Sequence, residues 1–196
     1  MKKKAIILVG ILIISSIFMI SVGANYSQTI SQNQCPGGSS QSYASNTEFV
    51  FTDVPKRPMG DGTLTVRVRG DYDFGREPPG GVSEGISVVV EGVVIEPLWV
   101  PETQCSFGLL TKTFILPQEK LREWATDGKI EVTLVQGGIG YLNEVNCFCS
   151  ARGTYEGGCP AAECGNINIV TLEYTGANNS LPMNWIIKKF GLGKEK

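Results

Sequence analysis

Apolar and polar residues alternate in short segments from Thr47 onward, and this period-two pattern constrains the fold more than any other feature of the chain. The segments 63–69, 129–134 and 170–174 carry apolar or aromatic residues at every second position, with charged or hydroxyl side chains between them. Such alternation is typical of antiparallel strands with one face on a core and the other in water. With Gly, Pro and Asp between the segments, it predicts an all-β fold, an antiparallel jelly-roll or Greek-key β-sandwich.

Two further segments refine this expectation. The β-branched run at 86–94 predicts either a strand that is buried on both sides or a strand that turns at Gly92. One short helix is predicted to begin at Pro117, because residues 121–125 place apolar side chains at helical spacing, and to end at Gly128. We expect this helix to close one end of the sandwich.

The first 24 residues have the composition of an export signal. Three lysines at 2–4 precede an apolar run at 5–20, and small residues lead up to Ala24. We expect residues 1–24 to be a signal peptide that is cleaved after Ala24. The alternative is an uncleaved membrane anchor, because the apolar stretch is long enough to span a bilayer. Both alternatives place the rest of the chain outside the cytoplasm, secreted or on the cell surface.

Charge and residue types exclude several functions. The chain has 17 basic and 19 acidic residues, and without the three leader lysines 14 basic residues remain, which gives a net charge of −5. A chain with this acidic balance is not expected to bind nucleic acid. Histidine is absent, which removes Ser/His/Asp and Cys/His catalysis and every histidine metal site. We therefore expect a protein that is not an enzyme.

Three segments are predicted after the leader. Residues 25–46 are rich in Ser, Gln and Asn and have almost no apolar content, so they are predicted to form a flexible polar arm. Residues 47–176 make the sandwich domain, with a Cys-rich insertion at 147–164. Residues 177–196 form a basic amphipathic tail, for which a membrane surface, a partner or its own domain are alternative docking sites. Membrane contact is expected only through this tail or an uncleaved leader.

The chain has six cysteines, an even number in a chain predicted to be exported. Export favours disulfides over a zinc site, and the spacings in the insertion are not those of common zinc knuckles. Spacing alone does not choose among the pairings. The predicted disulfide cysteines are Cys35, Cys105, Cys147, Cys149, Cys159 and Cys164.

Four acidic residues crowd a Gly- and Pro-rich loop between two predicted strands: Asp71, Asp73, Glu77 and Glu84. Calcium prefers carboxylate and carbonyl oxygens, and alternate acids on a turn can supply them. The loop is therefore a candidate calcium site, with Asp71 and Asp73 as the best ligands. The alternative is that these acids are only solvated.

Aromatic residues near this loop suggest a platform for sugar rings. Tyr72 and Phe74 are expected to be exposed and are the candidate ligand-binding residues. Trp99 and Tyr141 are further candidates, although core packing is the better expectation for Trp99, which lies between apolar neighbours.

Several pieces of the sequence, in order, resemble one type of extracellular β-sandwich module found in large secreted and cell-surface proteins of microbes. A strand ends in Gly-Asp-Tyr-Asp at 70–73, a second strand follows at 86–92, and Trp-Ala-Thr-Asp-Gly at 124–128 leads into a late strand. Cys105-Ser106 and the segment 113–117 also fit the pattern. The chain departs from it by standing alone rather than in an array, and by its Cys-rich insertion.

The resemblance implies a non-catalytic, jelly-roll-like domain for surface display, adhesion or assembly, sometimes with calcium. It also implies a disulfide from Cys105 to Cys147 or Cys149. Cys159 or Cys164 would then close the insertion, and one cysteine would remain for Cys35.

We therefore expect a secreted or surface-held module that binds other surface proteins, glycans or copies of itself. The first alternative is a self-assembling subunit of an extracellular filament or tube, in which the arm at 25–46 adds a strand to a neighbour's sheet. The second alternative is a carbohydrate-binding module.

Overall fold

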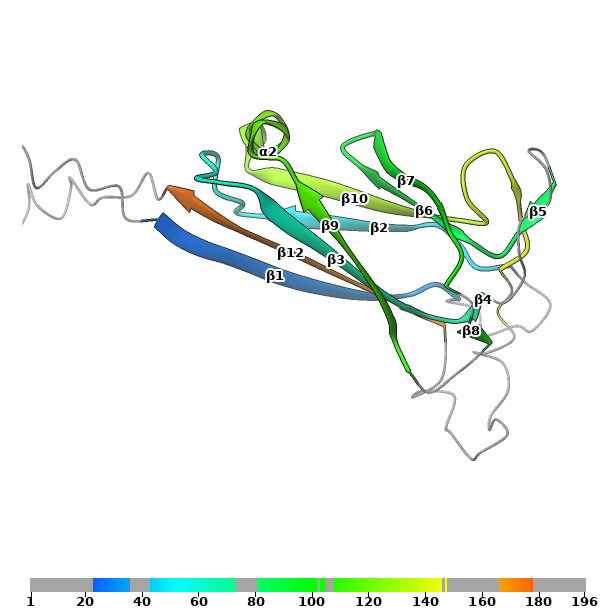
Figure 1. Ribbon diagram of the computed structural model, residues 1–196. Helices are drawn as coiled ribbons and strands as arrows, with labels where there is room; N and C mark the ends of the chain where they lie inside the picture. The colour runs from blue at the N-terminus through cyan, green and yellow to red at the C-terminus, as the bar shows by residue number, and fades with distance from the viewer. Residues whose placement is uncertain are drawn as a thin grey trace, which may run out of the picture.

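The computed structural model describes residues 23–35, 43–72, 81–101, 103–104, 108–145, 147 and 166–177 (Figure 1). The described chain is mostly β, with two four-stranded antiparallel sheets packed face to face and one short helix. The predicted all-β sandwich is confirmed at this level.

Along the sequence, the long strands change sheet at every step except from β6 to β7, which are neighbours in the second sheet. The first sheet has, in spatial order, β1 (Gly23–Asn33), β12 (Ile167–Ala177), β3 (Gly62–Arg69) and β9 (Leu110–Leu116). The second sheet has β2 (Thr47–Thr52), β10 (Lys129–Gln136), β6 (Ile86–Val90) and β7 (Val93–Trp99).

Two short strand pairs lie at the end of the sandwich away from the helix (Figure 1). One pair is antiparallel, β4 (Asp71–Tyr72) with β8 (Thr103–Gln104), and the other is parallel, β5 (Val82–Ser83) with β11 (Leu142–Asn143). They lengthen this end beyond the two main sheets.

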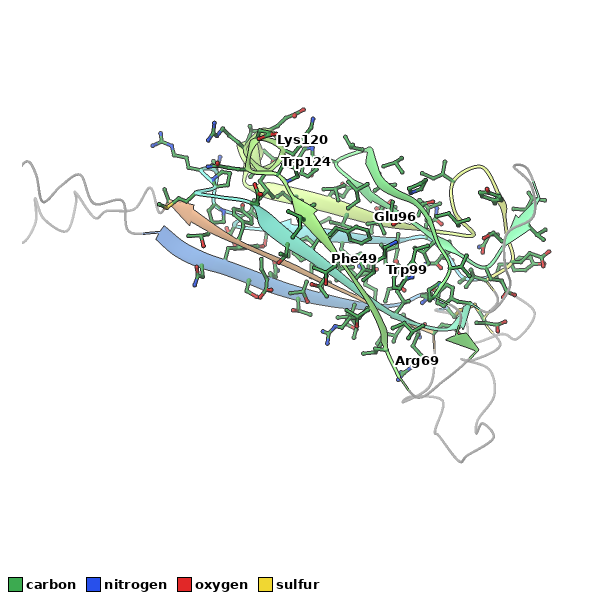
Figure 2. All side chains as sticks on the ribbon, viewed as in Figure 1. Phe49, Arg69, Glu96, Trp99, Lys120 and Trp124 are labelled. Atoms are coloured by element: carbon green, nitrogen blue, oxygen red, sulfur yellow. A yellow bond between two sulfur atoms is a disulfide. The ribbon has the colours of Figure 1, made fainter. Side chains whose placement is uncertain are left out.

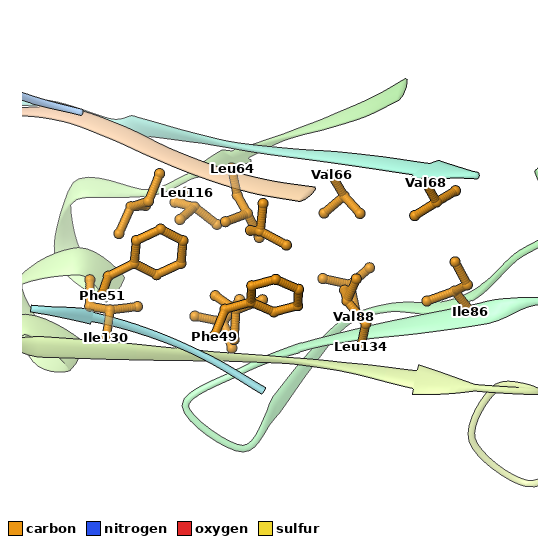
Figure 3. Packing of buried hydrophobic residues seen from close by; sticks show 14 of the residues in the cluster. Phe49, Phe51, Leu64, Val66, Val68, Ile86, Val88, Leu116, Ile130 and Leu134 are labelled. Carbon is orange, nitrogen blue, oxygen red and sulfur yellow. The ribbon is translucent and has the colours of Figure 1, made fainter. Parts of the chain in front are cut away.

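The core lies between the sheets, where the predicted inward positions meet. On β3 the side chains of Leu64, Val66 and Val68 are fully buried, and the same alternation holds on β10 and β12. Phe49 and Phe51 reach from β2 toward the opposite sheet and fill the space between the layers (Figure 3). The period-two pattern thus predicted the buried face of each of these strands.

The predicted helix is confirmed, with its start one residue later. It comprises α2 (Gln118–Trp124) and a 3-10 turn, η1 (Ala125–Asp127), and it covers one end of the sandwich (Figure 1). Pro117 has no side chain that can cap a helix, and instead the Gln118 N–H donates to Asp61 Oδ1 at 2.9 Å. Gly128 ends the segment at φ 88°, a left-handed conformation that glycine adopts without a Cβ clash.

The run at 86–94 turns at Gly92, which was one of the two predicted alternatives. Glu91 and Gly92 both have positive φ, 49° and 74°, as a two-residue turn between β6 and β7 requires. β6 lies in the interior of its sheet and β7 lies at the edge.

The predicted flexible arm is wrong for its first part. β1 forms an edge strand with eleven consecutive residue pairs to β12. Its inward side chains Tyr26 and Ile30 pack against the core. Polar composition suggested disorder, but a strand at a sheet edge needs few apolar residues, because backbone pairing with β12 supplies much of its binding.

The leader up to residue 22 and the tail from residue 178 lie outside the described residues. Within the described ranges, no helix has the length and apolar character to cross a membrane.

We predict that Phe49→Ala lowers the free energy of unfolding by about 3–5 kcal/mol, because it removes a fully buried ring and leaves a cavity between the sheets. Val50→Ala is the control: Val50 is the next residue on β2, points outward and is 44% exposed, so its loss should cost less than about 1 kcal/mol. Urea unfolding of both variants measures the difference. Equal losses would contradict the assignment of the inner face.

Candidate functional site

A buried polar network joins both sheets at the end of the sandwich opposite α2. The Tyr72 hydroxyl lies 2.8 Å from Gln34 Oε1 and 3.0 Å from Gln136 Oε1. Gln34 Nε2 donates to Asn168 Oδ1 at 2.8 Å, and Asn168 Nδ2 donates to Thr47 Oγ1 at 2.9 Å. All five side chains are buried, and they come from five different parts of the chain.

Amides and hydroxyls in a protein interior stabilise the fold only where they find partners. In this network each side chain reaches at least one other, and Gln136 Nε2 is buried without a partner in the described part of the chain. Burial raises the pKa of Tyr72, against the opposing effect of its contacts with Gln34 and Gln136. The network is therefore neutral, and its role in the described structure is to fix how the two sheets meet.

A disulfide lies directly beside this network. Cys35 follows Gln34 and pairs with Cys147, with 5.7 Å between the Cα atoms. Both cysteines are buried, and 112 residues separate them in the sequence. The disulfide ties the end of β1 to the segment that follows β11.

The disulfide partly corrects the pairing that the resemblance implied. Cys147 bonds to Cys35 and is therefore not the partner of Cys105. No local pattern indicates this pair, because the contact depends on the position of β1, a segment whose polar composition predicts a flexible arm. The other four cysteines, Cys105, Cys149, Cys159 and Cys164, lie outside the described residues.

The candidate calcium ligands are described only in part. Asp71 lies in β4 and is 5% exposed, and Glu84 follows β5 and is 8% exposed. Asp73 and Glu77 lie outside the described residues. Within the described ranges, no three His, Cys, Asp or Glu side chains are grouped so that they could hold a metal ion.

The expected exposure of Tyr72 is wrong, because its side chain is fully buried within the network. The other candidate ligand-binding residue, Phe74, lies outside the described residues. Trp99 packs against the core, as expected (Figure 2). Lys112 Nζ lies 5.9 Å from the centre of the Trp99 ring and forms an ion pair with Glu96. This tryptophan therefore lies at an edge of the sandwich that the ion pair closes.

The outer face of the first sheet carries a row of four threonines that sequence analysis missed. Thr29, Thr171, Thr65 and Thr113 are successive partners across the four strands. Their hydroxyl oxygens are 2.8 Å apart between Thr29 and Thr171 and 3.3 Å apart between Thr65 and Thr113. The row could not be read from the sequence because it depends on the strand order and on the register.

A pocket of about 290 Å³ opens on the same face, near the start of β1. Its two acids already have structural partners. Asp61 accepts the first N–H of α2, and Glu173 Oε1 accepts a hydrogen bond from Ser27 Oγ at 2.9 Å. The pocket therefore offers a polar surface for hydrogen bonds, in which the Ser27 hydroxyl lies against the Glu173 carboxylate.

Two tyrosines connect the first sheet to the last residue of β2 and to the loop that follows it. The Tyr26 hydroxyl donates to Thr52 O at 3.1 Å, and the Tyr174 hydroxyl donates to Pro55 O at 2.8 Å. Burial, and to a smaller extent the charge of Asp53, raises the pKa of Tyr26 to about 12. Burial and the neighbouring Tyr26 also raise the pKa of Tyr174. Both groups act as neutral hydrogen-bond donors at physiological pH.

No protein-family model matches this chain, and no curated protein is significantly similar to it. Its function is therefore argued from its own residues.

We predict that Tyr72→Phe lowers the free energy of unfolding by about 1–3 kcal/mol, because Gln34 and Gln136 lose a buried partner while the ring stays in place. Tyr43→Phe is the matched control. Tyr43 is 58% exposed, and its hydroxyl should contribute less than about 0.5 kcal/mol. Chemical denaturation of the two variants tests this, and an unchanged midpoint for Tyr72→Phe would show that the network does not hold the sheets together.

Proposed function

We propose that this protein is an exported, non-catalytic β-sandwich module with jelly-roll connectivity, which binds partners or builds structure at the cell surface. The strand order supports the connectivity. In chain order the eight long strands change sheet at every step except from β6 to β7. The resulting orders, β1-β12-β3-β9 and β2-β10-β6-β7, are those that a chain wound as two Greek keys produces.

The observation that carries the proposal is the disulfide between Cys35 and Cys147. Disulfides persist in oxidising compartments and are rare in the reducing cytoplasm. This one is buried beside the polar network and closes a long loop, so it belongs to the folded structure rather than to a reactive surface. It supports export, as does the signal-like composition of residues 1–24.

A non-catalytic role is supported by the chemistry of the polar sites. The buried network consists of amides and hydroxyls, and the two acids of the surface pocket are engaged by Gln118 and Ser27. Histidine is absent from the whole sequence.

The open face of the first sheet is suited to binding. Its outward side chains are largely hydroxyls and amides, which can exchange hydrogen bonds with glycans or with another protein surface. The alternative function, carbohydrate binding, is weakened because the Tyr72 ring is buried and cannot stack on a sugar. The other alternative, a filament subunit that donates its arm to a neighbour, is weakened because β1 pairs with β12 of its own chain.

We further propose that calcium stabilises the loop that contains Asp71. Calcium takes about six to eight oxygen ligands. Asp71 in β4 and Glu84 directly after β5 are carboxylates with little exposure. β4 and β5 lie at the same end of the sandwich (Figure 1). Asp73 and Glu77 would have to supply further oxygens. A cation offsets part of the desolvation that buried carboxylates undergo.

The export proposal predicts that the full chain, produced in its own host, is found in the medium or on the cell surface with oxidised cysteines. Thiol labelling under denaturing conditions, with and without prior reduction, measures the oxidation. Protease treatment of whole cells measures the exposure. Protein confined to the cytoplasm with reactive Cys35 and Cys147 would overturn the proposed function.

The calcium proposal predicts that adding calcium to chelator-treated protein raises the melting temperature, because a ligand that binds only the folded state stabilises it. Asp71→Asn should abolish the rise. Glu48→Gln removes an exposed carboxylate from β2 and should leave the rise unchanged. No rise in the unmodified protein, or an equal rise in both variants, would contradict a calcium site at Asp71.

A further inference from the structure

β1 is an edge strand whose outer side no described strand covers. It is the end member of its sheet and runs for eleven residues in unbroken register with β12. An exposed edge of this kind offers a row of backbone N–H and C=O groups to any extended chain, so proteins usually protect it with charges, prolines, bulges or covering side chains. The segment 23–33 contains no charged residue and no proline.

The other edge of the first sheet is protected by an inward-pointing charge. Lys112 lies at the middle of β9 and points between the sheets, where its ammonium group pairs with Glu96 of β7. The same ammonium group lies 5.9 Å from the centre of the Trp99 ring and 5.6 Å from that of Phe114. A further strand paired with β9 would crowd this partly exposed ion pair. The charges at this edge therefore disfavour the addition of a strand.

Both edges of the second sheet are protected as well. β7 contains Pro97, and its register with β6 shifts twice. β2 is only six residues long, and side chains of β1 cover its backbone: Gln28 Oε1 accepts from Thr52 N, and Gln32 Nε2 donates to Glu48 O. Within the part of the chain that the structure describes, β1 is the one edge of these two sheets that has none of these protections.

The outward side chains of β1 have the same order of residue types from either end of the strand. They are Asn25, Ser27, Thr29, Ser31 and Asn33, which are symmetric about Thr29. If two such strands pair antiparallel about Thr29, each residue meets its own type: Thr29 meets Thr29, Ser27 meets Ser31, and Asn25 meets Asn33. Amides and hydroxyls both donate and accept, so every one of these pairs can form hydrogen bonds.

We propose that the β1 edge is a self-association site, at which two copies of this chain pair β1 to β1 about a two-fold axis through Thr29. The two first sheets then join into one continuous eight-stranded sheet. A two-fold interface uses the same patch on both copies and must be self-complementary, which the symmetric segment satisfies. The threonine row extends across the axis from one copy to the other, with the type of hydroxyl contact that Thr29 already makes to Thr171.

The charge distribution favours a second copy as the occupant. The chain without its leader is acidic, so most surfaces of two copies repel each other, whereas the segment 23–33 is uncharged. Pairing by backbone and hydroxyl groups should not weaken as salt rises, unlike an association through opposite charges. This inference deepens the proposed function by naming one partner of the surface module.

Sedimentation equilibrium of the purified full chain tests the inference. We expect a mass twice that of the chain, retained when sodium chloride is raised. Thr29→Lys should weaken the association by about tenfold or more, because it sets two ammonium groups opposite each other at the axis. Thr113→Lys makes the same change in the same row of the sheet, on edge strand β9, and should keep the dimer. Melting curves of both variants confirm that they fold.

Cysteine cross-linking tests the register. Thr29→Cys lies on the proposed axis and should give a disulfide-linked dimer on a non-reducing gel, beyond any seen with the unmodified protein. Ser27→Cys alone should not, because its partner is Ser31, whereas Ser27→Cys combined with Ser31→Cys should.

Three results would overturn the inference: a monomer at high protein concentration, an open-ended polymer in place of a dimer, or a dimer that Thr113→Lys disrupts and Thr29→Lys does not. A monomer would leave the exported binding module intact. Cytoplasmic location would overturn the proposed function and leave the dimer test unaffected.

Discussion

The pairing of β1 with β12 is the constraint on which the rest of this structure depends. It joins the first and last described segments of the chain by eleven residue pairs and gives the first sheet its fourth strand. Tyr26, Gln28 and Gln32 of β1 then reach across to the backbone of β2 and close the open side of the sandwich. Without β1, the edge of β12 and the backbone of β2 would both face solvent.

Two further features hold β1 in place at its end. Gln34, directly after β1, is hydrogen-bonded within the buried amide network. The disulfide between Cys35 and Cys147 links this end of β1 covalently to the segment after β11. A buried polar network adds less stability than an apolar core of the same volume, but it permits only one arrangement of its members. We therefore assign the network the role of fixing the register of the two sheets, and the apolar core between Phe49 and Leu64 the role of driving collapse.

Sequence patterns identified the core because burial on a strand depends on local alternation. The inward positions of β3, β10 and β12, the helix after Pro117 and the turn at Gly92 all follow from residues close together in the chain. The errors concern long-range contacts. The segment 25–33 is polar and was predicted to be flexible, because nothing local shows that a strand 150 residues away will pair with it.

The candidate sites show the same limit. Tyr72 lies next to the acidic, glycine-rich loop, which predicted exposure, but Gln34 and Gln136 come from distant parts of the chain to bury its hydroxyl. The partner of Cys35 and the threonine row on the first sheet likewise require the strand order. For Asp71 and Glu84, the sequence predicted the chemistry of oxygen ligands but not their burial.

Residue-resolved hydrogen exchange on β1 distinguishes an edge strand paired with β12 from a free arm. In an edge strand only every second amide bonds to its neighbour. If β1 pairs with β12, we expect amides between Asn25 and Asn33 to alternate between slow and fast exchange at low protein concentration, with the slow set matching the ladder to β12. Fast exchange at every amide of this segment would show that it is a free arm, and would contradict the account.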